Sequence, residues 1–304
     1  MRTSFAIVFL LPSIAFAQPT AAQKKETVNW VTDLQDPNGG FYPNPQDPNT
    51  DAAPRPSLRA TSSAARVLKY LGADVPNKDK HAAFVLKCYD PKTGGFAEPG
   101  GKPDVVLTSI GVMAAAEFGI PHEKYAKAMD YLKENAKTFE DVRIGAAGVE
   151  AWGVKDCPFK LDSWFEIAAT YGRDTFKGAP GAEQAREAGS LLAFNLRLKP
   201  DEKLEPGNQA AVAAPLLTGQ RADGGWGKKG EKASDIETTY RVMRALMLLK
   251  EKPKDVKELR AFINAHRNKD GGFATKPGDK SSMGGVYYCT VISKWLDEMD
   301  AAKK

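Results

Sequence analysis

Cysteine and histidine are scarce in this chain of 304 residues, with three of each. Cys88, Cys157 and Cys289 lie far apart, without the short spacing of metal-ligand pairs, and an odd count leaves at least one thiol outside any disulfide. Free cysteine behaves as a small apolar residue, so we expect all three to be buried. The scarcity argues against a disulfide framework and against a cysteine-rich metal module.

A strong excess of charge is also missing. The net charge is +5, spread along the chain, and no basic run carries interleaved aromatics. A nucleic-acid partner is therefore not expected.

Long hydrophobic runs are absent apart from Phe5 to Phe16, which is shorter than the roughly 20 residues that span a bilayer. Arg2 precedes this run and Ala15-Phe16-Ala17 ends it, which is the pattern of a secretory signal peptide and its cleavage site. We expect residues 1–17 to be removed and the protein to be exported, either periplasmic or secreted. No transmembrane segment is expected in the mature chain.

What the chain does contain is a repeat. Four segments, LQDPNGGFYP, DPKTGGFAEPGG, TGQRADGGWGKK and AHRNKDGGFATKPG, place Gly-Gly-aromatic after an apolar run and before a polar loop and a small-residue-rich helix. Glycine permits the positive φ that a sharp reversal at a helix end needs, and the aromatic can fold back between neighbouring hairpins. Self-similarity at this spacing predicts an array of helical hairpins.

Six hairpins can be drawn through residues 18–304, which we expect to form a single domain. Closing six hairpins into a ring protects the ends that an open array leaves exposed, so the predicted fold is all-α, an α6/α6 toroid. The predicted pairs are 24–34 with 57–71, a unit from 84 to 119, 122–137 with 139–152, 161–171 with 183–196, 208–217 with 236–249, and 256–266 with 286–299.

The segments FVLKCYDPKTGGFAEPGG and FINAHRNKDGGFATKPGDKSSMGGVYYCT resemble the repeats of protein prenyltransferase β subunits and of terpenoid cyclases of the squalene-hopene type. The likeness is greatest to the β subunit of type II geranylgeranyl transferase and extends in spacing from Glu26 to Met299. It implies inner helices around an apolar cavity that takes an isoprenoid chain.

The resemblance also implies a zinc site in the prenyltransferases, and its ligands are not matched here. The Asp-x-Cys motif before Tyr falls on Glu237-Thr238-Thr239-Tyr240, and the His-Thr motif falls on Leu107-Thr108 or Tyr288-Cys289. A neutral threonine hydroxyl is a poor zinc ligand, so we expect no metal and no cofactor. The Asp-x-Asp-Asp acid motif of the cyclases is absent, and catalytic residues are not identified.

The N-termini of the inner helices should meet at one rim of the ring, where unpaired N–H groups and helix dipoles favour an anion such as a diphosphate. The residues expected to line this rim and bind a ligand are Arg59, Asp104, Arg143, Glu237, Tyr240, Arg244, Tyr287 and Tyr288, with Thr61, Thr108, Glu140, Arg186 and Glu187 nearby.

Purely structural roles compete with this interpretation. Ser234-Asp235-Ile236-Glu237 has the form of a capping box, and Asp104 fits an N-cap. Tyr240, Tyr287 and Tyr288 fit packing roles better than binding roles, because such aromatics more often pack than line a site.

The favoured function is an exported toroid that binds an isoprenoid-like or other apolar ligand in its central cavity without zinc-dependent protein prenylation. Three alternatives stay open. One is an active prenyltransferase or cyclase relative with a divergent site, and another is a non-catalytic scaffold for a protein partner. The third is a carbohydrate-active α/α barrel whose carboxylate pair would come from Glu140, Glu187 and Glu237.

Overall fold

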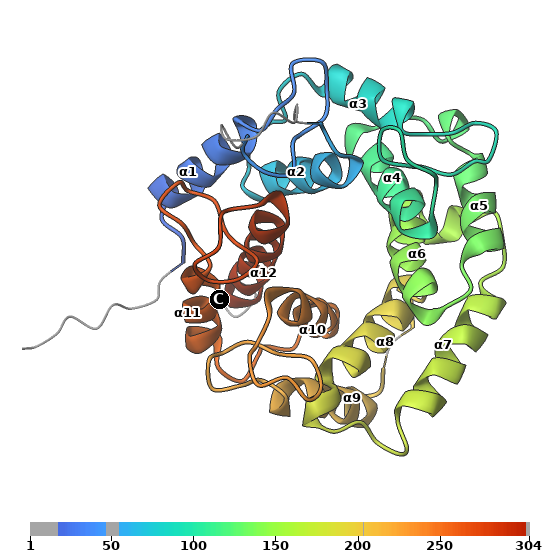
Figure 1. The fold of residues 1–304 in the computed structure, drawn as a ribbon. Coiled ribbons are helices and arrows are strands. Elements are labelled where there is room, and N and C mark those ends of the chain that lie inside the picture. The colour runs from blue at the N-terminus through green and yellow to red at the C-terminus, as the bar shows by residue number, and fades with distance from the viewer. Residues whose placement is uncertain (1–17, 47–54, 203, 302–304) are drawn as a thin grey trace, which may run out of the picture.

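A computed structural model describes residues 18–46, 55–202 and 204–301. The predicted signal peptide, residues 1–17, lies outside this part of the chain. Within it, twelve α-helices alternate between an outer and an inner layer (Figure 1), and no strand forms beyond isolated bridges. The outer helices are α1 (Ala21–Thr32), α3 (Lys78–Lys87), α5 (Lys127–Asn135), α7 (Asp162–Thr175), α9 (Pro206–Thr218) and α11 (Val256–Ala265). The inner helices are α2 (Leu58–Tyr70), α4 (Val105–Phe118), α6 (Phe139–Trp152), α8 (Ala185–Leu198), α10 (Ile236–Leu249) and α12 (Met283–Ala301).

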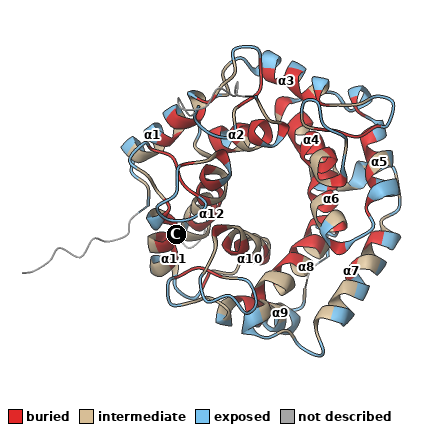
Figure 2. Ribbon diagram, in the orientation of Figure 1, coloured by how far each residue is buried: buried red, intermediate tan, exposed pale blue. Residues whose placement is uncertain are grey.

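The inner helices close into a ring. Each contacts the next, and α12 contacts α2, so the two ends of the array meet. The predicted α6/α6 toroid is therefore confirmed. Buried residues fill the space between the two layers, while the outer faces of the outer helices are exposed (Figure 2). No helix among the described residues combines the length and the hydropathy that crossing a membrane requires.

Each of the four Gly-Gly-aromatic corners packs against the next outer helix around the ring. The first glycine of each pair has positive φ, for example +83° at Gly94 and +85° at Gly271. A Cβ at Gly94 would lie 2.6 Å from the carbonyl oxygen of Lys127 on the next outer helix, and one at Gly271 would lie 2.9 Å from Glu26 on α1. Only glycine allows this approach, so the last corner closes the ring onto the first helix.

The aromatic residue after each glycine pair is buried. In three of the four corners its backbone N–H bonds to a side chain of an inner helix. The backbone N–H groups of Phe41, Phe96 and Trp226 each donate a 3.0 Å hydrogen bond to a threonine hydroxyl. The three acceptors, which occupy equivalent places in their hairpins, are Thr61, Thr108 and Thr239. All three side chains are buried, so Thr61 and Thr108 belong to the corners rather than to the predicted rim.

Three details differ from expectation. The helix expected over 122–137 is split into a 3-10 turn at His122–Lys124 and α5, and the helix expected from residue 183 starts at Ala185 after another 3-10 turn. Cys88 and Cys289 are buried as predicted, but Cys157 is half-exposed because it lies in the loop after α6.

Candidate functional site

The ring encloses a central cavity of about 410 Å³. All six inner helices line it, mostly with their N-terminal halves. Six parallel helices therefore direct the positive ends of their dipoles toward one mouth. The lining residues that carry polar chemistry are Arg59, Ser62, Ser63, Arg66, Glu140, Arg143, Ser190, Arg197, Glu237, Tyr240, Arg241, Arg244, Tyr287 and Tyr288.

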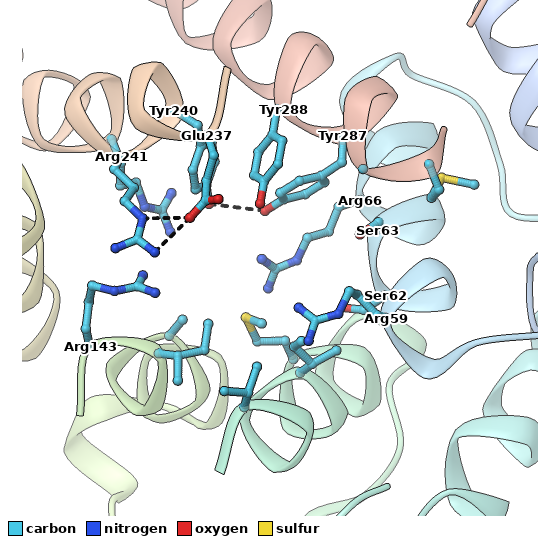
Figure 3. A pocket seen from close by; sticks show the side chains of 18 of the residues that line it. Arg59, Ser62, Ser63, Arg66, Arg143, Glu237, Tyr240, Arg241, Tyr287 and Tyr288 are labelled. Carbon is cyan, nitrogen blue, oxygen red and sulfur yellow. Dashed lines mark hydrogen bonds and ion pairs between the residues drawn. The ribbon is translucent and has the colours of Figure 1, made fainter. Parts of the chain in front are cut away.

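The cavity has two unlike walls. Helices α4 and α6 contribute an apolar wall of Val106, Ile110, Met113, Ile144 and Ala147. Helices α2, α10 and α12 contribute arginine and tyrosine side chains that point into the space from the other side (Figure 3). An apolar surface faced by a few polar groups is the usual form of a small-molecule site.

A chain of ion pairs crosses the mouth. Glu140 on α6 accepts from Arg143 at 2.8 Å and from Arg241 on α10 at 2.9 Å, and Arg241 also bonds Glu237 at 2.8 Å. Burial raises the pKa of Glu140, but the bonds from Arg241 and Arg143 outweigh burial and lower this pKa to about 2. Both carboxylates are therefore paired with arginines of the protein itself.

Deeper in the ring, arginines outnumber carboxylates. Glu150 bridges Arg197 at 3.4 Å and Arg244 at 3.0 Å, and Glu117 lies 3.3 Å from Arg66. Three guanidinium groups thus share two carboxylates. The Arg66 and Arg197 Nε atoms make these ion pairs, whereas the buried Arg244 Nε has no hydrogen-bond partner among the described residues. This part of the cavity is positively charged and has an unused donor.

Arg197 forms the floor of the cavity. Burial, with a smaller contribution from the Arg244 guanidinium, lowers the pKa of Arg197 to about 10, which still leaves it protonated at neutral pH. The same side chain lines a second hollow of about 440 Å³ beyond the C-terminal ends of α6, α8 and α10. Arg197 therefore separates the cavity from the opposite face of the ring.

Three tyrosines cover the wall between α10 and α12. The hydroxyl oxygens of Tyr240 and Tyr287 lie 3.2 Å apart, and Tyr240 stacks on Trp295 with 5.3 Å between ring centroids. Burial raises the pKa of Tyr288 to about 12. These phenols are placed to hydrogen-bond a ligand that enters from the mouth.

Seven of the eight residues expected at the rim line this cavity: Arg59, Arg143, Glu237, Tyr240, Arg244, Tyr287 and Tyr288. Asp104 does not line it. Its carboxylate accepts the Leu107 N–H at 2.6 Å and so caps α4.

The capping box expected at Glu237 is wrong. The cap of α10 is Asp235, which accepts the Thr238 N–H at 2.7 Å, while the Glu237 side chain turns to Arg241. An ion pair one turn along the helix replaces the bond to the helix N-terminus, and Glu237 is left facing the cavity.

The sequence analysis missed Arg66, Arg197 and Arg241. Arg66 stands seven residues after Arg59, and Arg241 four residues after Glu237, which are spacings that keep side chains on one helix face. These two were therefore recoverable from the sequence. Nothing in the sequence around Arg197 sets it apart.

The positions that correspond to the zinc ligands of the prenyltransferases do not fit a zinc ion. The Thr239 hydroxyl accepts from Trp226 and donates to the Asp235 carbonyl oxygen at 2.8 Å. Cys289 is fully buried, and burial raises the pKa of its thiol far above the ordinary value of 9. The described residues contain no group of three or more His, Cys, Asp or Glu that could hold a metal.

Comparison with curated protein sequences gave no significant match. Similar solved structures include a protein from Actinoplanes (12% identity, TM-score 0.58, covering 92% of this chain and 99% of that one). A glycosidase is 15% identical (TM-score 0.57, 91% of this chain, 96% of that one). The type II terpene cyclase MstE from Scytonema is 13% identical (TM-score 0.55, 93% and 99%). At these identities the likeness shows a shared fold.

The family model of the prenyltransferase alpha-alpha toroid domain matches residues 4–151 and 160–303, which is nearly the whole chain. The match agrees with the closed ring of six hairpins and with the Gly-Gly-aromatic corners that hold it. This chain belongs to the prenyltransferase α-α toroid family.

Proposed function

We propose that this protein binds one amphiphilic ligand in its central cavity: an isoprenoid-like or other apolar chain that bears an anionic group. The observation that carries the proposal is an apolar surface on α4 and α6 that faces arginines of α2 and α10 across the cavity, with Glu140 and Arg143 of α6 at the mouth. We further propose that the protein acts after export and without zinc-dependent protein prenylation.

The size and charge of the cavity support this reading. A volume of about 410 Å³ falls in the range of roughly 300 to 1,000 Å³ that is usual for small-molecule sites. Guanidinium groups bind carboxylate and phosphate oxygens through two parallel hydrogen bonds. A structure of MstE_D109N, which shares this fold, holds geranylgeranyl dihydroxybenzoate, an apolar chain joined to a polar head.

Farnesyl phosphate and farnesol form a matched pair of probes, because they share the chain and differ in the anion. We expect calorimetry to show one farnesyl phosphate bound per chain and farnesol at least tenfold weaker. Ile144→Trp fills the cavity from its apolar wall and should abolish binding of both probes. Arg59 lies within ion-pair distance of no described carboxylate, so Arg59→Gln removes a cation without leaving an acid unpaired.

The control is Arg173→Gln, an exposed arginine on the outer helix α7 that bonds Thr170. This variant should bind both probes as the wild type does. In Arg59→Gln the affinity for farnesyl phosphate should fall toward the affinity for farnesol. Equal affinity for the two probes would contradict the anionic head. Unchanged binding by Ile144→Trp would place the ligand elsewhere.

A carbohydrate-active barrel is favoured only by the glycosidase among the fold neighbours. In glycoside hydrolysis one carboxyl acts as a general acid and needs a raised pKa. Here Glu140 has a pKa of about 2, and Glu237 shares the same Arg241 guanidinium. Glu187 is paired with Arg186. The pairing of these carboxylates with arginine argues against glycoside hydrolysis.

The open cavity also argues against a purely structural scaffold, because such a scaffold needs no ligand-sized space inside the ring.

Export and metal independence have direct tests. Protein expressed from the full sequence and recovered outside the cytoplasm should begin near Gln18 by intact-mass measurement. Elemental analysis of protein prepared without added metal should find no stoichiometric zinc. A chain that keeps Met1, or one zinc per chain, would contradict the respective part of the proposal.

A further inference from the structure

The Tyr240–Tyr287 pair, a hydrogen-bonded pair of phenols from two helices, forms one wall of the cavity. Tyr240 comes from α10 and Tyr287 from α12, and their hydroxyl oxygens are 3.2 Å apart (Figure 3). The Tyr240 ring is fixed by stacking on Trp295, and the Arg244 guanidinium lies over the same indole with 5.3 Å to the ring centroid. The pair is therefore rigid, and it faces the space in which a ligand would bind.

Positive charge reaches the pair from three helices. Arg66 on α2, Arg197 on α8 and Arg244 on α10 all act on Tyr240, and their only carboxylate partners among the described residues are Glu117 and Glu150. One guanidinium charge is left unbalanced by these contacts. The buried Nε of Arg244 has no hydrogen-bond partner among the described residues, so an additional negative charge here would be stabilised by the excess guanidinium charge and by this donor.

The other titratable neighbours are Tyr288, whose pKa is raised by burial, the Glu237–Arg241 ion pair on α10, and Arg59 on α2. Burial also acts to raise the pKa of Tyr240. The Arg244 and Arg197 guanidinium groups and the hydrogen bond from Tyr287 outweigh burial, so the pKa of Tyr240 is lowered from its ordinary value of 10. Burial and the neighbouring Tyr240 raise the pKa of Tyr287. The two phenols therefore titrate as one unit, with Tyr240 losing its proton first and Tyr287 donating to the phenolate.

We propose that the Tyr240–Tyr287 pair is an acid–base site, in which the Tyr240 phenolate accepts a proton from a weakly acidic hydroxyl of the ligand beside Arg66 and Arg244. The ligand O–H bond breaks, its electron pair stays on the ligand oxygen, and the proton forms the O–H bond of Tyr240. Tyr287 keeps its own proton throughout. The resulting ligand oxyanion takes the place of the phenolate as the negative charge facing the arginines.

The chemistry of the base defines the class of hydroxyl. Proton transfer is efficient when donor and acceptor have similar acidity, so the matching groups are phenols and enols rather than simple alcohols. This inference rests on the proposed function for the presence of a ligand in the cavity. It further specifies that the ligand carries a weakly acidic hydroxyl and that the tyrosine pair accepts a proton from it.

The first experiment needs no ligand. Ultraviolet difference absorbance follows phenolate formation as pH rises, and the chain has nine tyrosines. We expect one ninth of the total amplitude to appear as a separate phase below the ordinary tyrosine pKa of about 10. Tyr240→Phe should lose this phase, and Tyr70→Phe, the control at the C-terminal end of α2 and outside the cavity, should keep it. Arg244→Gln should move it to higher pH.

The second experiment uses 2-naphthol, a phenol with an apolar body whose ionised form has its own absorbance. Bound to the wild type or to Tyr70→Phe, it should ionise at a pH at least one unit lower than free 2-naphthol. Bound to Tyr240→Phe, it should ionise at a higher pH than in the wild type, because the arginines remain but the proton acceptor is lost. Circular dichroism confirms that each variant is folded.

A wild type without the early phenolate phase, or a phase that survives in Tyr240→Phe, would overturn the proposal. So would 2-naphthol that fails to bind or stays neutral in the wild type. Farnesyl phosphate carries no phenol, so loss of its binding tests the proposed function alone. The two ideas therefore fail separately.

Discussion

Thr238 and Thr239 are neighbours at the start of α10, and their buried hydroxyls are in opposite situations. The Thr239 hydroxyl accepts the Trp226 N–H at 3.0 Å and donates to the Asp235 carbonyl oxygen at 2.8 Å. The Thr238 hydroxyl has no hydrogen-bond partner among the described residues. A buried polar group lowers stability unless it is bonded, so the two positions should respond differently to the same change.

Replacing each threonine by valine keeps the shape and removes only the hydroxyl. Thr239→Val leaves the Trp226 N–H unsatisfied and should lower the free energy of unfolding by about 1 to 3 kcal/mol. Thr238→Val should be neutral or stabilise by up to about 1 kcal/mol, because it removes an unpaired polar atom. Urea unfolding measures both. Equal losses at the two positions would show that the corner bond contributes nothing specific.

At the scale of elements, the mouth of the cavity is held by bonds between helices that are not neighbours in the ring. Glu140 belongs to α6 and Arg241 to α10, with α8 between them (Figure 1). The bond therefore ties α6 to α10 across α8, near the N-terminal ends of both. Because the Glu140 side chain is half-exposed, we expect this ion pair to contribute little to the free energy of unfolding. Its effect should be seen in how stability changes with pH.

The sign of the pH effect follows from the lowered pKa. Glu140 titrates near 2 in the folded chain and near 4.5 when unfolded, so its stabilising contribution is present above pH 4.5 and is lost as the pH falls toward 2. Glu140→Gln should remove that part of the acid sensitivity of the melting temperature. Glu123→Gln, in the exposed turn before α5, is the control and should melt as the wild type does at each pH. An unchanged acid profile for Glu140→Gln would contradict the assignment.

Most element boundaries followed from the sequence. Residues 139–152 and 236–249 were predicted as helices and are α6 and α10 with those bounds, because apolar periodicity and a capping residue coincide there. The segment 122–137 was predicted less well. Its first turn is a 3-10 turn in which His122 stacks on Trp152 of the next helix. Such a contact between elements is not visible in local periodicity.

At the scale of the whole molecule, the ring is closed by contacts between segments that lie more than two hundred residues apart in the sequence. Gly271 in the last corner packs against the backbone of Glu26 on α1, and the Thr27 hydroxyl donates to the Gly271 carbonyl oxygen at 2.8 Å. The Trp30 indole N–H donates to Asp270 beside it. The first and last hairpins are thereby joined.

Gly271→Ala tests this closure, and Gly278→Ala is its matched control. The two glycines have nearly the same φ, +85° and +88°, but a Cβ at Gly278 meets nothing within 4 Å. Gly278→Ala should therefore carry only backbone strain, about 1 kcal/mol. Gly271→Ala adds a collision with Glu26 and should lose at least about 1 kcal/mol more in urea unfolding. Equal losses would show that closing the ring adds little stability.

The sequence by itself determined the fold of this protein, because its information is local and repeated. Each Gly-Gly-aromatic corner specifies a reversal through backbone geometry and a buried ring, and repetition of that unit leaves a closed array as the way to bury every apolar face. The same local logic placed seven of the predicted residues around one cavity, since each stands near the start of an inner helix.

Only the tertiary structure decided what the cavity is like. The excess of arginine arises where Arg66, Arg197 and Arg244 converge from three helices, and the Tyr240–Tyr287 contact joins residues 47 positions apart. Which carboxylate meets which arginine, and which threonine faces a corner, depends on the rotation of each helix about its axis. That rotation is set by packing against neighbours distant in sequence, so the charge of the site could not be worked out from any one segment.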